Sequence, residues 1–199
     1  MFPSLPPATR TLIIINFAVF LLQQVPGVGQ TIEGLFALWP LGSGLFHPWQ
    51  LITYAFLHGG WAHILFNMFA LYMFGGALER YWGGRRLILF YLVCCFTAAL
   101  TQLAVQYPAG STEPVLGASG GIFGILLAFA WYFPSQRIIL LFPPIPMPAW
   151  LFVTLYGLLE LFLGVSGREP GVAHFAHLGG MLGGALAILY WRARHRFSS

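Results

Sequence analysis

Residues 87–106 read LILFYLVCCFTAALTQLAVQ, a run of 20 residues without a charged side chain. A helix of about this length crosses the roughly 30 Å hydrocarbon core of a bilayer. The whole chain has the same character, because 58% of its 199 residues are hydrophobic and 7% are charged, whereas a soluble domain carries about 25% charged residues. The sequence therefore predicts an all-α membrane protein and excludes an ordinary soluble globule.

Further apolar runs flank this one on both sides. They cover about residues 11–25, 62–78, 117–133, 148–165 and 172–191, which makes six predicted transmembrane helices. No polar block between them is long enough for a soluble domain or a nucleic-acid-binding module. We therefore expect one membrane domain over residues 1–199 and no nucleic-acid partner.

The arginines predict the orientation, since short cytoplasmic loops of membrane proteins are enriched in Lys and Arg. If the chain crosses six times with both termini in the cytoplasm, Arg168 alone lies on the outer side and the other eight arginines are cytoplasmic. Residues 26–61 then form an outer loop between the first two helices. This loop is rich in aromatic residues and nearly free of charge, which predicts an amphipathic, partly embedded segment.

Two residue types are absent from the chain, Lys and Asp. Their absence excludes a Ser-Lys dyad, a Ser-His-Asp triad and an aspartyl protease. Polar residues inside a membrane are costly and are usually functional. Those that stand within the apolar runs are therefore the candidates for chemistry.

Three polar sites are expected at similar depth below the outer surface. His63 and Asn67 are four residues apart and so share a helix face. Ser119 stands among glycines at the start of the fourth run, and His177 stands in the first two turns of the sixth. The free N–H groups of a helix N-terminus would stabilise an oxyanion beside Ser119, and His63 and Asn67 would add donors. The alternatives are helix packing by the glycines and a buried polar pair for His63 and Asn67.

Gly180 and Gly184 follow His177 and form a stripe without side chains, which permits the close approach of another helix. An approach to the start of the fourth run would bring His177 beside Ser119. A Ser-His dyad is the pair of nucleophile and base that the composition leaves. Glu160, in the fifth run, is able in principle to orient the histidine, although we favour a structural hydrogen bond for it.

Four stretches follow one another along the chain in a distinctive order. They are FLHGGWAHILFN at 56–67, GGALERYWG at 75–83, GASGGIFG at 117–124 and AHLGGMLGG at 176–184. In this combination the chain resembles the rhomboid family of intramembrane serine proteases. The resemblance covers about residues 47–191.

The resemblance implies a role for each of the polar residues. Ser119 would be the nucleophile and His177 the general base, while His63 and Asn67 would help to form the oxyanion hole. Phe123 matches an aromatic residue that packs against the catalytic imidazole. The implied fold is a six-helix bundle whose short fourth helix starts inside the membrane, below a water-filled cavity open to the outer side.

Three further residues match structural positions of the family or depart from them. His58 matches a histidine of the outer loop region, and Glu79 is expected to anchor the inner end of the second helix. Gln50 stands where some bacterial rhomboids have an arginine that holds the outer loop. This departure puts the anchoring of the loop in doubt.

The expected function is that of an intramembrane serine endopeptidase without a metal or other cofactor. Its substrates would be transmembrane proteins that reach the site sideways from the lipid, and membrane lipids would surround it. We expect a multi-pass protein of the cell membrane, the bacterial inner membrane, with its active site open to the extracytoplasmic side. The sequence leaves the oligomeric state open.

The sequence fits three other functional classes less well. A metal-dependent membrane enzyme would use His58, His63, His174 and His177, but the chain has no HExxH motif and no glutamate at a ligand spacing from them. A non-catalytic rhomboid-like protein that binds membrane clients is the second alternative, and such relatives generally lack part of the catalytic set. A transporter or channel is the third, and no path of polar residues continues inward to support it.

Overall fold

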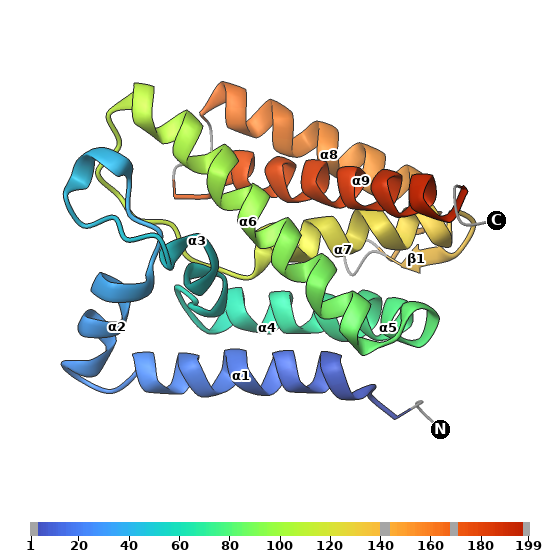
Figure 1. The fold of residues 1–199 in the computed structure, drawn as a ribbon, viewed down its shortest axis with the longest axis horizontal. Helices are drawn as coiled ribbons and strands as arrows, with labels where there is room; N and C mark the ends of the chain where they lie inside the picture. Colours follow the sequence, from blue (N-terminus) through green and yellow to red (C-terminus); the bar gives the residue numbers. More distant parts are fainter. Residues whose placement is uncertain (1–3, 140–143, 168–170, 197–199) are drawn as a thin grey trace.

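Helices run side by side along most of the chain (Figure 1). The computed structural model describes residues 4–139, 144–167 and 171–196, so the prediction for Arg168 lies outside the described residues. Each of the predicted apolar runs coincides with helix. The long helices are α1 (Pro7–Gln23), α4 (Trp61–Ala70), α6 (Gly84–Ala109), α7 (Ser119–Tyr132), α8 (Ala149–Ser166) and α9 (His174–Arg196). The α4 helix continues through a π-helical segment, Leu71–Gly75, into α5 (Gly76–Trp82).

Within the described residues, three helical segments are long and apolar enough to cross a membrane. They are Trp61–Trp82, Gly84–Pro108 and Ala149–Ser166. The α1 and α7 helices are apolar but shorter. The chain is therefore a mostly helical membrane protein.

Two connections have structure of their own. Between α1 and α4 lie the short helices α2 (Val28–Phe36) and α3 (Gln50–Thr53), with 3₁₀ turns at Leu41–Ser43 and Tyr54–Phe56. Between α7 and α8, the strands β1 (Arg137–Ile139) and β2 (Pro146–Pro148) pair antiparallel, with Ile138 opposite Met147. The sequence pattern did not predict this ribbon, since three-residue strands are too short to show a period.

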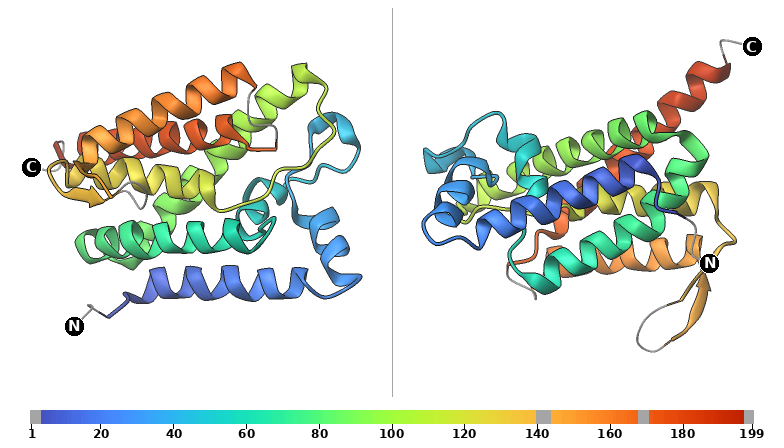
Figure 2. Two further views of the ribbon diagram at one scale, coloured as in Figure 1. Left: turned by 180° about the vertical axis from the view of Figure 1, so that it is seen from behind. Right: turned by 90° about the horizontal axis from the view of Figure 1, so that it is seen from below.

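The α7 helix lies at the centre of the molecule. In both side views it runs between α4 and α9, and α6 crosses it (Figures 1 and 2). Ten of its 14 residues are buried, so its surface faces protein instead of lipid. It begins part-way along the bundle, which places its N-terminus inside the molecule (Figure 1).

Glycines allow α7 and α9 to touch along their backbones. A Cβ atom on Gly180 would overlap the carbonyl oxygen of Gly120, and a Cβ atom on Gly184 would lie 3.3 Å from the Cα of Gly124. Interfaces of this kind need residues without side chains. The contact fixes the height at which the first turn of α9 faces the first turn of α7.

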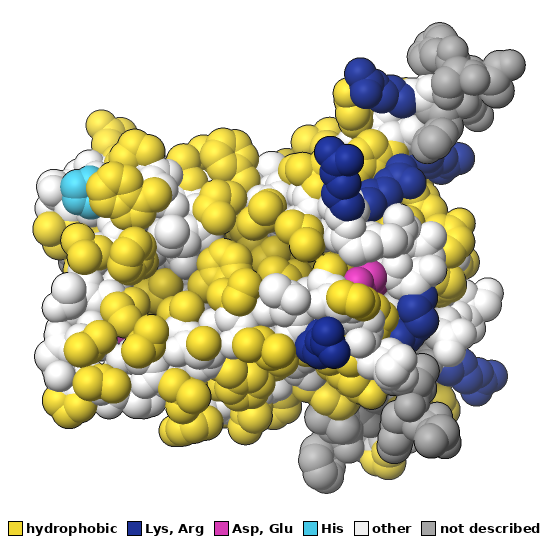
Figure 3. Space-filling view, turned by 60° about the horizontal axis from the view of Figure 1, so that its bottom comes forward, with side chains coloured by type: hydrophobic (Ala, Val, Ile, Leu, Met, Phe, Trp, Pro, Cys, Tyr) yellow, Lys and Arg dark blue, Asp and Glu magenta, His cyan; other side chains and the backbone are white. Residues whose placement is uncertain are grey.

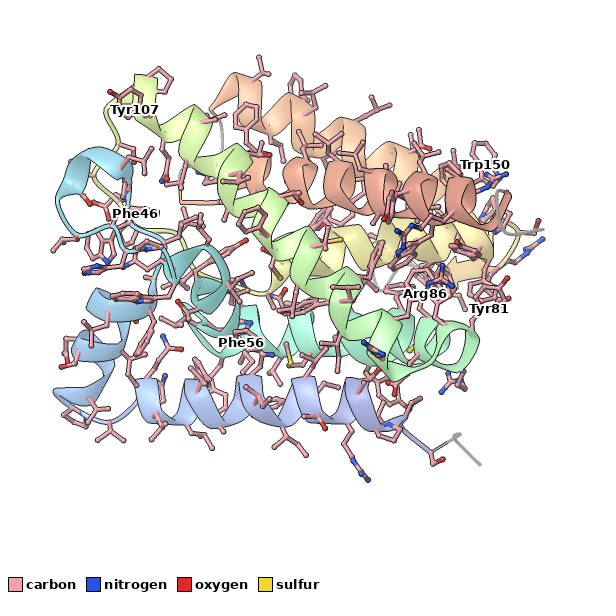
Figure 4. All side chains as sticks on the ribbon, in the orientation of Figure 1. Phe46, Phe56, Tyr81, Arg86, Tyr107 and Trp150 are labelled. Carbon is pink, nitrogen blue, oxygen red and sulfur yellow. The ribbon has the colours of Figure 1, made fainter. Side chains whose placement is uncertain are left out.

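The outer surface separates apolar and basic side chains. Hydrophobic side chains cover most of the face in Figure 3, and the arginines gather at the end where both termini lie. Arg86 and Tyr81 are at this end, whereas Tyr107 and Phe46 are at the opposite one (Figure 4). An apolar surface with basic side chains gathered at one end is typical of a membrane protein.

Gln50 anchors the segment between α1 and α4. Its fully buried side chain accepts hydrogen bonds from the backbone N–H groups of Trp39 (3.3 Å) and His47 (3.2 Å), and it donates to the carbonyls of Leu35 (3.2 Å) and Leu45 (3.0 Å). The doubt raised by the missing arginine was therefore misplaced. A neutral amide satisfies four backbone groups without burying a charge.

Glu79 ties α5 to the beginning of α1. Its carboxylate accepts hydrogen bonds from the backbone N–H groups of Ala8 (2.8 Å) and Thr9 (2.7 Å) and from the Thr9 hydroxyl (2.7 Å). These amides belong to the first turn of α1, where backbone donors have no partner within the helix. The carboxylate thus caps one helix from another.

Candidate active site

Ser119 and His177 meet where α7 and α9 begin. The Nε2 atom of His177 lies 2.8 Å from the Oγ atom of Ser119. Ser119 is the first residue of α7 and His177 is in the first turn of α9, so the glycine contact between these helices sets their distance. The two residues are 58 apart in sequence. The arrangement is that of a hydroxyl with an adjacent base.

The imidazole of His177 is held on one face by Phe123. The two rings are stacked, with centroids 4.2 Å apart and planes 5° apart. Phe123 lies one turn after Ser119 on α7 and also contacts the ring of Tyr156 from α8. The stack limits rotation of the imidazole, whose Nε2 contacts the serine hydroxyl.

Glu160 of α8 contacts the other nitrogen of the same ring. Its Oε2 atom lies 2.8 Å from Nδ1 of His177 and 2.7 Å from Nδ1 of His174. The side chain is buried. The sequence analysis favoured a structural hydrogen bond for Glu160, and the fold shows that its carboxylate contacts the catalytic candidate His177 as well as His174.

These three residues also form the one group that has the composition of a metal site within the described part of the chain. One ligand atom from each of Glu160, His174 and His177 lies within 4.8 Å of the others. The expectation that no glutamate stands at a ligand spacing from the histidines was wrong, because the helices bring together residues that are 14 and 17 apart in sequence. The four-histidine cluster is instead divided into His58 with His63 and His174 with His177.

His63 lies beside the first residues of the serine segment. A Cβ atom on Gly117 would lie 2.7 Å from Cε1 and 2.8 Å from Nε2 of His63, and 3.8 Å from Oγ of Ser119. Gly117 has φ +132°, which a residue with a side chain rarely adopts. A glycine is therefore needed here both for the backbone and for the space beside His63.

The protonation of His63 follows from its hydrogen bond. The backbone N–H of Gly59 donates to its Nδ1 at 3.3 Å, so Nδ1 carries the lone pair and Nε2 carries the hydrogen in the neutral ring. Asn67 lies one turn later and uses one amide hydrogen to bind the carbonyl of His63 at 2.8 Å. Its second amide hydrogen remains for another acceptor.

A cavity of about 730 Å³ lies over these residues. Its lining includes His63, Asn67, Gly117, Ser119 and His177, together with Phe152 and Tyr156 of α8. The cavity is large enough for several residues of an extended peptide. All the polar residues predicted for the site are thus brought to one cavity.

His58 packs edge-to-face against the ring of His63, with centroids 5.1 Å apart. Gln23 of α1 holds its backbone, because the N–H of His58 donates to Oε1 of Gln23 at 3.0 Å. Burial, and then the proximity of His63, lower the pKa of His58 to about 3. His58 is therefore neutral in the folded protein.

Comparisons with known proteins point to one family. A profile of the rhomboid domain matches residues 45–194. The rhomboid protease GluP of Bacillus subtilis is 29% identical over 185 residues, 92% of this chain and 34% of its own. Rhomboid protein 1, mitochondrial, of Saccharomyces cerevisiae is 30% identical and covers 94% and 56% of the two chains. The rhomboid protease GlpG of Photorhabdus laumondii is 28% identical and covers 97% and 64%. The chain thus spans between about a third and two thirds of the length of these relatives.

Proposed function

The chain belongs to the rhomboid family, and from that premise we propose that it is an intramembrane serine endopeptidase. The observation that carries the proposal is the 2.8 Å contact between Ser119 Oγ and His177 Nε2 at the wall of a cavity. The substrates would be transmembrane segments of other membrane proteins. Two relatives that carry the name rhomboid protease support this assignment.

The proposed threading has six crossings, with both termini in the cytoplasm. The crossings would be made by the three long apolar segments, by the shorter α1 and α7 helices and by α9. The basic end of the molecule would face the cytoplasm of a cell membrane, taken to be a bacterial inner membrane, because basic loops are retained there (Figure 3). The cavity, lined by residues such as Gly59 and Val172 from the opposite end, would open to the extracytoplasmic side.

The proposed reaction begins at the serine hydroxyl. Ser119 Oγ attacks the carbonyl carbon of the scissile peptide bond while His177 Nε2 takes the hydroxyl proton. The tetrahedral intermediate collapses as His177 passes this proton to the leaving amine, which gives an acyl-enzyme on Ser119. A water molecule, deprotonated by His177, then attacks the ester and releases the new carboxyl end.

The oxyanion of the intermediate would be held by three donors. These are the backbone N–H of Ser119, which stands at an uncapped helix start, the Nε2–H of His63 and the second amide hydrogen of Asn67. The orientation of His63 supports the role, because its Nδ1 is already occupied as an acceptor and its Nε2 faces Gly117. Removal of one such donor typically lowers kcat by about 10² to 10³.

Substrate access is proposed beside α8. Only 17% of the apolar part of this helix is buried, yet Phe152 and Tyr156 line the cavity from its inner face. A substrate that enters here must unwind, because a helical backbone engages its own carbonyls. Residues that weaken a helix near the cleavage site should therefore favour cleavage.

The test is cleavage of a single-span model substrate by the purified full chain in liposomes. Ser119→Ala and His177→Ala should leave the substrate intact, while Ser166→Ala, at the exposed end of α8, should cleave it at the wild-type rate. Cleavage by Ser119→Ala would overturn the assignment. An inert wild type that fails to react with a fluorophosphonate probe would favour the non-catalytic, client-binding function instead.

The oxyanion roles have a separate test. His63→Ala and Asn67→Ala should each lower kcat by about 10² to 10³ while the folded fraction is retained. Unchanged rates would leave these residues as a buried polar pair that joins α4 to its neighbours.

A further inference from the structure

Glu160 lies behind His177, on the side of the imidazole opposite to Ser119. One of its oxygens, Oε2, contacts Nδ1 of His177 at 2.8 Å and Nδ1 of His174 at 2.7 Å, and the side chain is 5% exposed. The other nitrogen of His177 contacts Ser119 at 2.8 Å. A continuous chain of hydrogen bonds therefore runs from the carboxylate of α8 through α9 to the hydroxyl of α7.

The direction of these hydrogen bonds follows from the chemistry of the groups. An ionised carboxylate only accepts, so each Nδ1 must donate to it. His177 then carries its hydrogen on Nδ1 and presents the lone pair of Nε2 to the Ser119 hydroxyl. This is the tautomer that a general base for serine requires.

We propose that Glu160 is a positioning residue that completes a Ser119–His177–Glu160 triad, with His174 holding the carboxylate in place. The inference rests on the proposed protease function and deepens it, because a dyad was expected from a sequence without Asp. The carboxylate comes from a separate helix, α8. It belongs to a glutamate, whose side chain is longer than that of aspartate, and it takes the place that Asp has in a Ser-His-Asp triad. When His177 takes the serine proton, the negative charge of the buried Glu160 carboxylate stabilises the adjacent imidazolium.

His174 holds the carboxylate in place through a second hydrogen bond to the same oxygen. It lies on α9 three residues before His177, and the two rings are nearly perpendicular, at 87°, with centroids 6.3 Å apart. Both rings thus reach the same oxygen from different directions. A buried carboxylate needs such partners, because a single hydrogen bond leaves most of the loss of solvation uncompensated.

A metal ion shared by the same three residues fits the distances less well. Ligand nitrogens and oxygens at about 2.1 Å from a tetrahedral zinc ion stand about 3.4 Å apart. The contacts of 2.7 and 2.8 Å between Glu160 and the two histidines are shorter and match charge-assisted hydrogen bonds. The triad is therefore the arrangement that the geometry favours.

The test compares Glu160→Gln with the wild type in steady-state cleavage of the liposome substrate. Glutamine keeps the shape of the side chain but is neutral. Its amide oxygen therefore accepts the two N–H groups more weakly than an ionised carboxylate does. We expect kcat to fall by about 10² to 10⁴, as for loss of the carboxylate from a serine triad, with KM within about threefold. Glu33→Gln in the outer segment is the matched control and should leave kcat unchanged.

Three further variants separate positioning from folding. Glu160→Asp keeps the negative charge on a side chain that is one methylene shorter. It should have a higher kcat than Glu160→Gln if the charge matters, whereas a purely structural role would give no such recovery. His174→Gln should lower kcat by a smaller factor, about tenfold. The substrate affinity of Ser119→Ala and of the double variant Ser119→Ala with Glu160→Gln should be equal, which shows that the fold and the cavity are intact.

The outcomes are distinct for the two proposals. If the wild type cleaves in a Ser119-dependent way and Glu160→Gln retains full kcat, the triad is refuted and the protease function stands. If the wild type has no Ser119-dependent activity, the protease function itself fails. Stoichiometric zinc in the purified protein that is lost in Glu160→Gln would overturn the hydrogen-bonded triad in favour of a metal site.

Discussion

The contact between α7 and α9 yields the sharpest prediction, because it can be disturbed without touching any catalytic group. Gly180 lies one turn after His177 and presses against the backbone of Gly120, which follows Ser119. The substitution Gly180→Ala adds one methyl group at this contact. Its effect should appear at the active site, not only in stability.

The size of the effect follows from the distances. A Cβ atom on Gly180 would overlap the carbonyl oxygen of Gly120 and lie 2.7 Å from the carbonyl carbon, while ordinary contact begins at 3.4 Å. The difference between these two values means that the added Cβ needs about 0.7 Å more distance from the carbonyl carbon of Gly120. It needs still more from the carbonyl oxygen. Because both neighbours are backbone atoms, the helices themselves must separate by roughly 1 Å.

Such a separation would lengthen the 2.8 Å contact between His177 Nε2 and Ser119 Oγ beyond hydrogen-bond distance. A misplacement of 1 Å costs about 10² in rate, and overpacking of this kind costs about 1 to 3 kcal/mol of stability. We expect Gly180→Ala to lower kcat at least about a hundredfold. The assay is substrate cleavage in liposomes, with the thermal midpoint in detergent measured on the same preparation.

A graded series controls for the loss of stability. A Cβ atom on Gly184 would lie 3.0 Å from the ring of Phe90 and 3.3 Å from the Cα of Gly124, so Gly184→Ala should have an intermediate effect. Gly34 on α2 has no atom within 4 Å of the added carbon, and Gly34→Ala should be silent. Wild-type kcat in Gly180→Ala would refute the reasoning that the glycine contact positions the histidine.

Three further predictions concern the parts that support the site. Glu79→Gln removes the charge that caps α1 at Thr9, and it should lower the free energy of unfolding in detergent by about 1 to 3 kcal/mol. Gln50→Ala leaves four backbone groups without their partner, so proteolysis of the segment between α1 and α4 should become faster than in the wild type. His58 has a pKa of about 3 when folded and 6.5 as the reference for the unfolded chain. Stability should therefore fall by up to about 1.4 kcal/mol for each pH unit between 6.5 and 3, and His58→Gln should flatten this part of the pH profile.

The sequence predicted the helices because each apolar run is long and almost free of charge. It also placed His63, Asn67 and His177 at a similar depth to Ser119, and all four residues line one cavity, where His177 contacts Ser119. The ribbon between α7 and α8 lay beyond such a prediction, because three-residue strands carry no periodicity. The hydrogen bonds of Gln50 were also beyond it, since they depend on where the loop backbone turns.

The position of Glu160 could be determined only from the fold. Its place in the fifth apolar run marks it as a costly polar group that needs a partner, but the partner depends on how α8 is rotated against α9. A spacing rule along the chain gives no information on residues that belong to different helices. The prediction of a dyad rested on the absence of Asp, which excludes one kind of triad but not a glutamate from another helix.

The same carboxylate links chemistry to the position of α8. Of the residues of α8, Ala149, Val153 and Glu160 are buried, so the helix is held to the bundle by few side chains, and two of its described polar contacts run from Glu160 to α9. A displacement of α8 that is large enough to admit a substrate from the lipid would lengthen both contacts. His177 would then lose the partner that fixes its tautomer, so its Nε2 lone pair would no longer be held toward Ser119 while substrate enters. The arrangement with Glu160 would form again only when α8 returns to its place against α9.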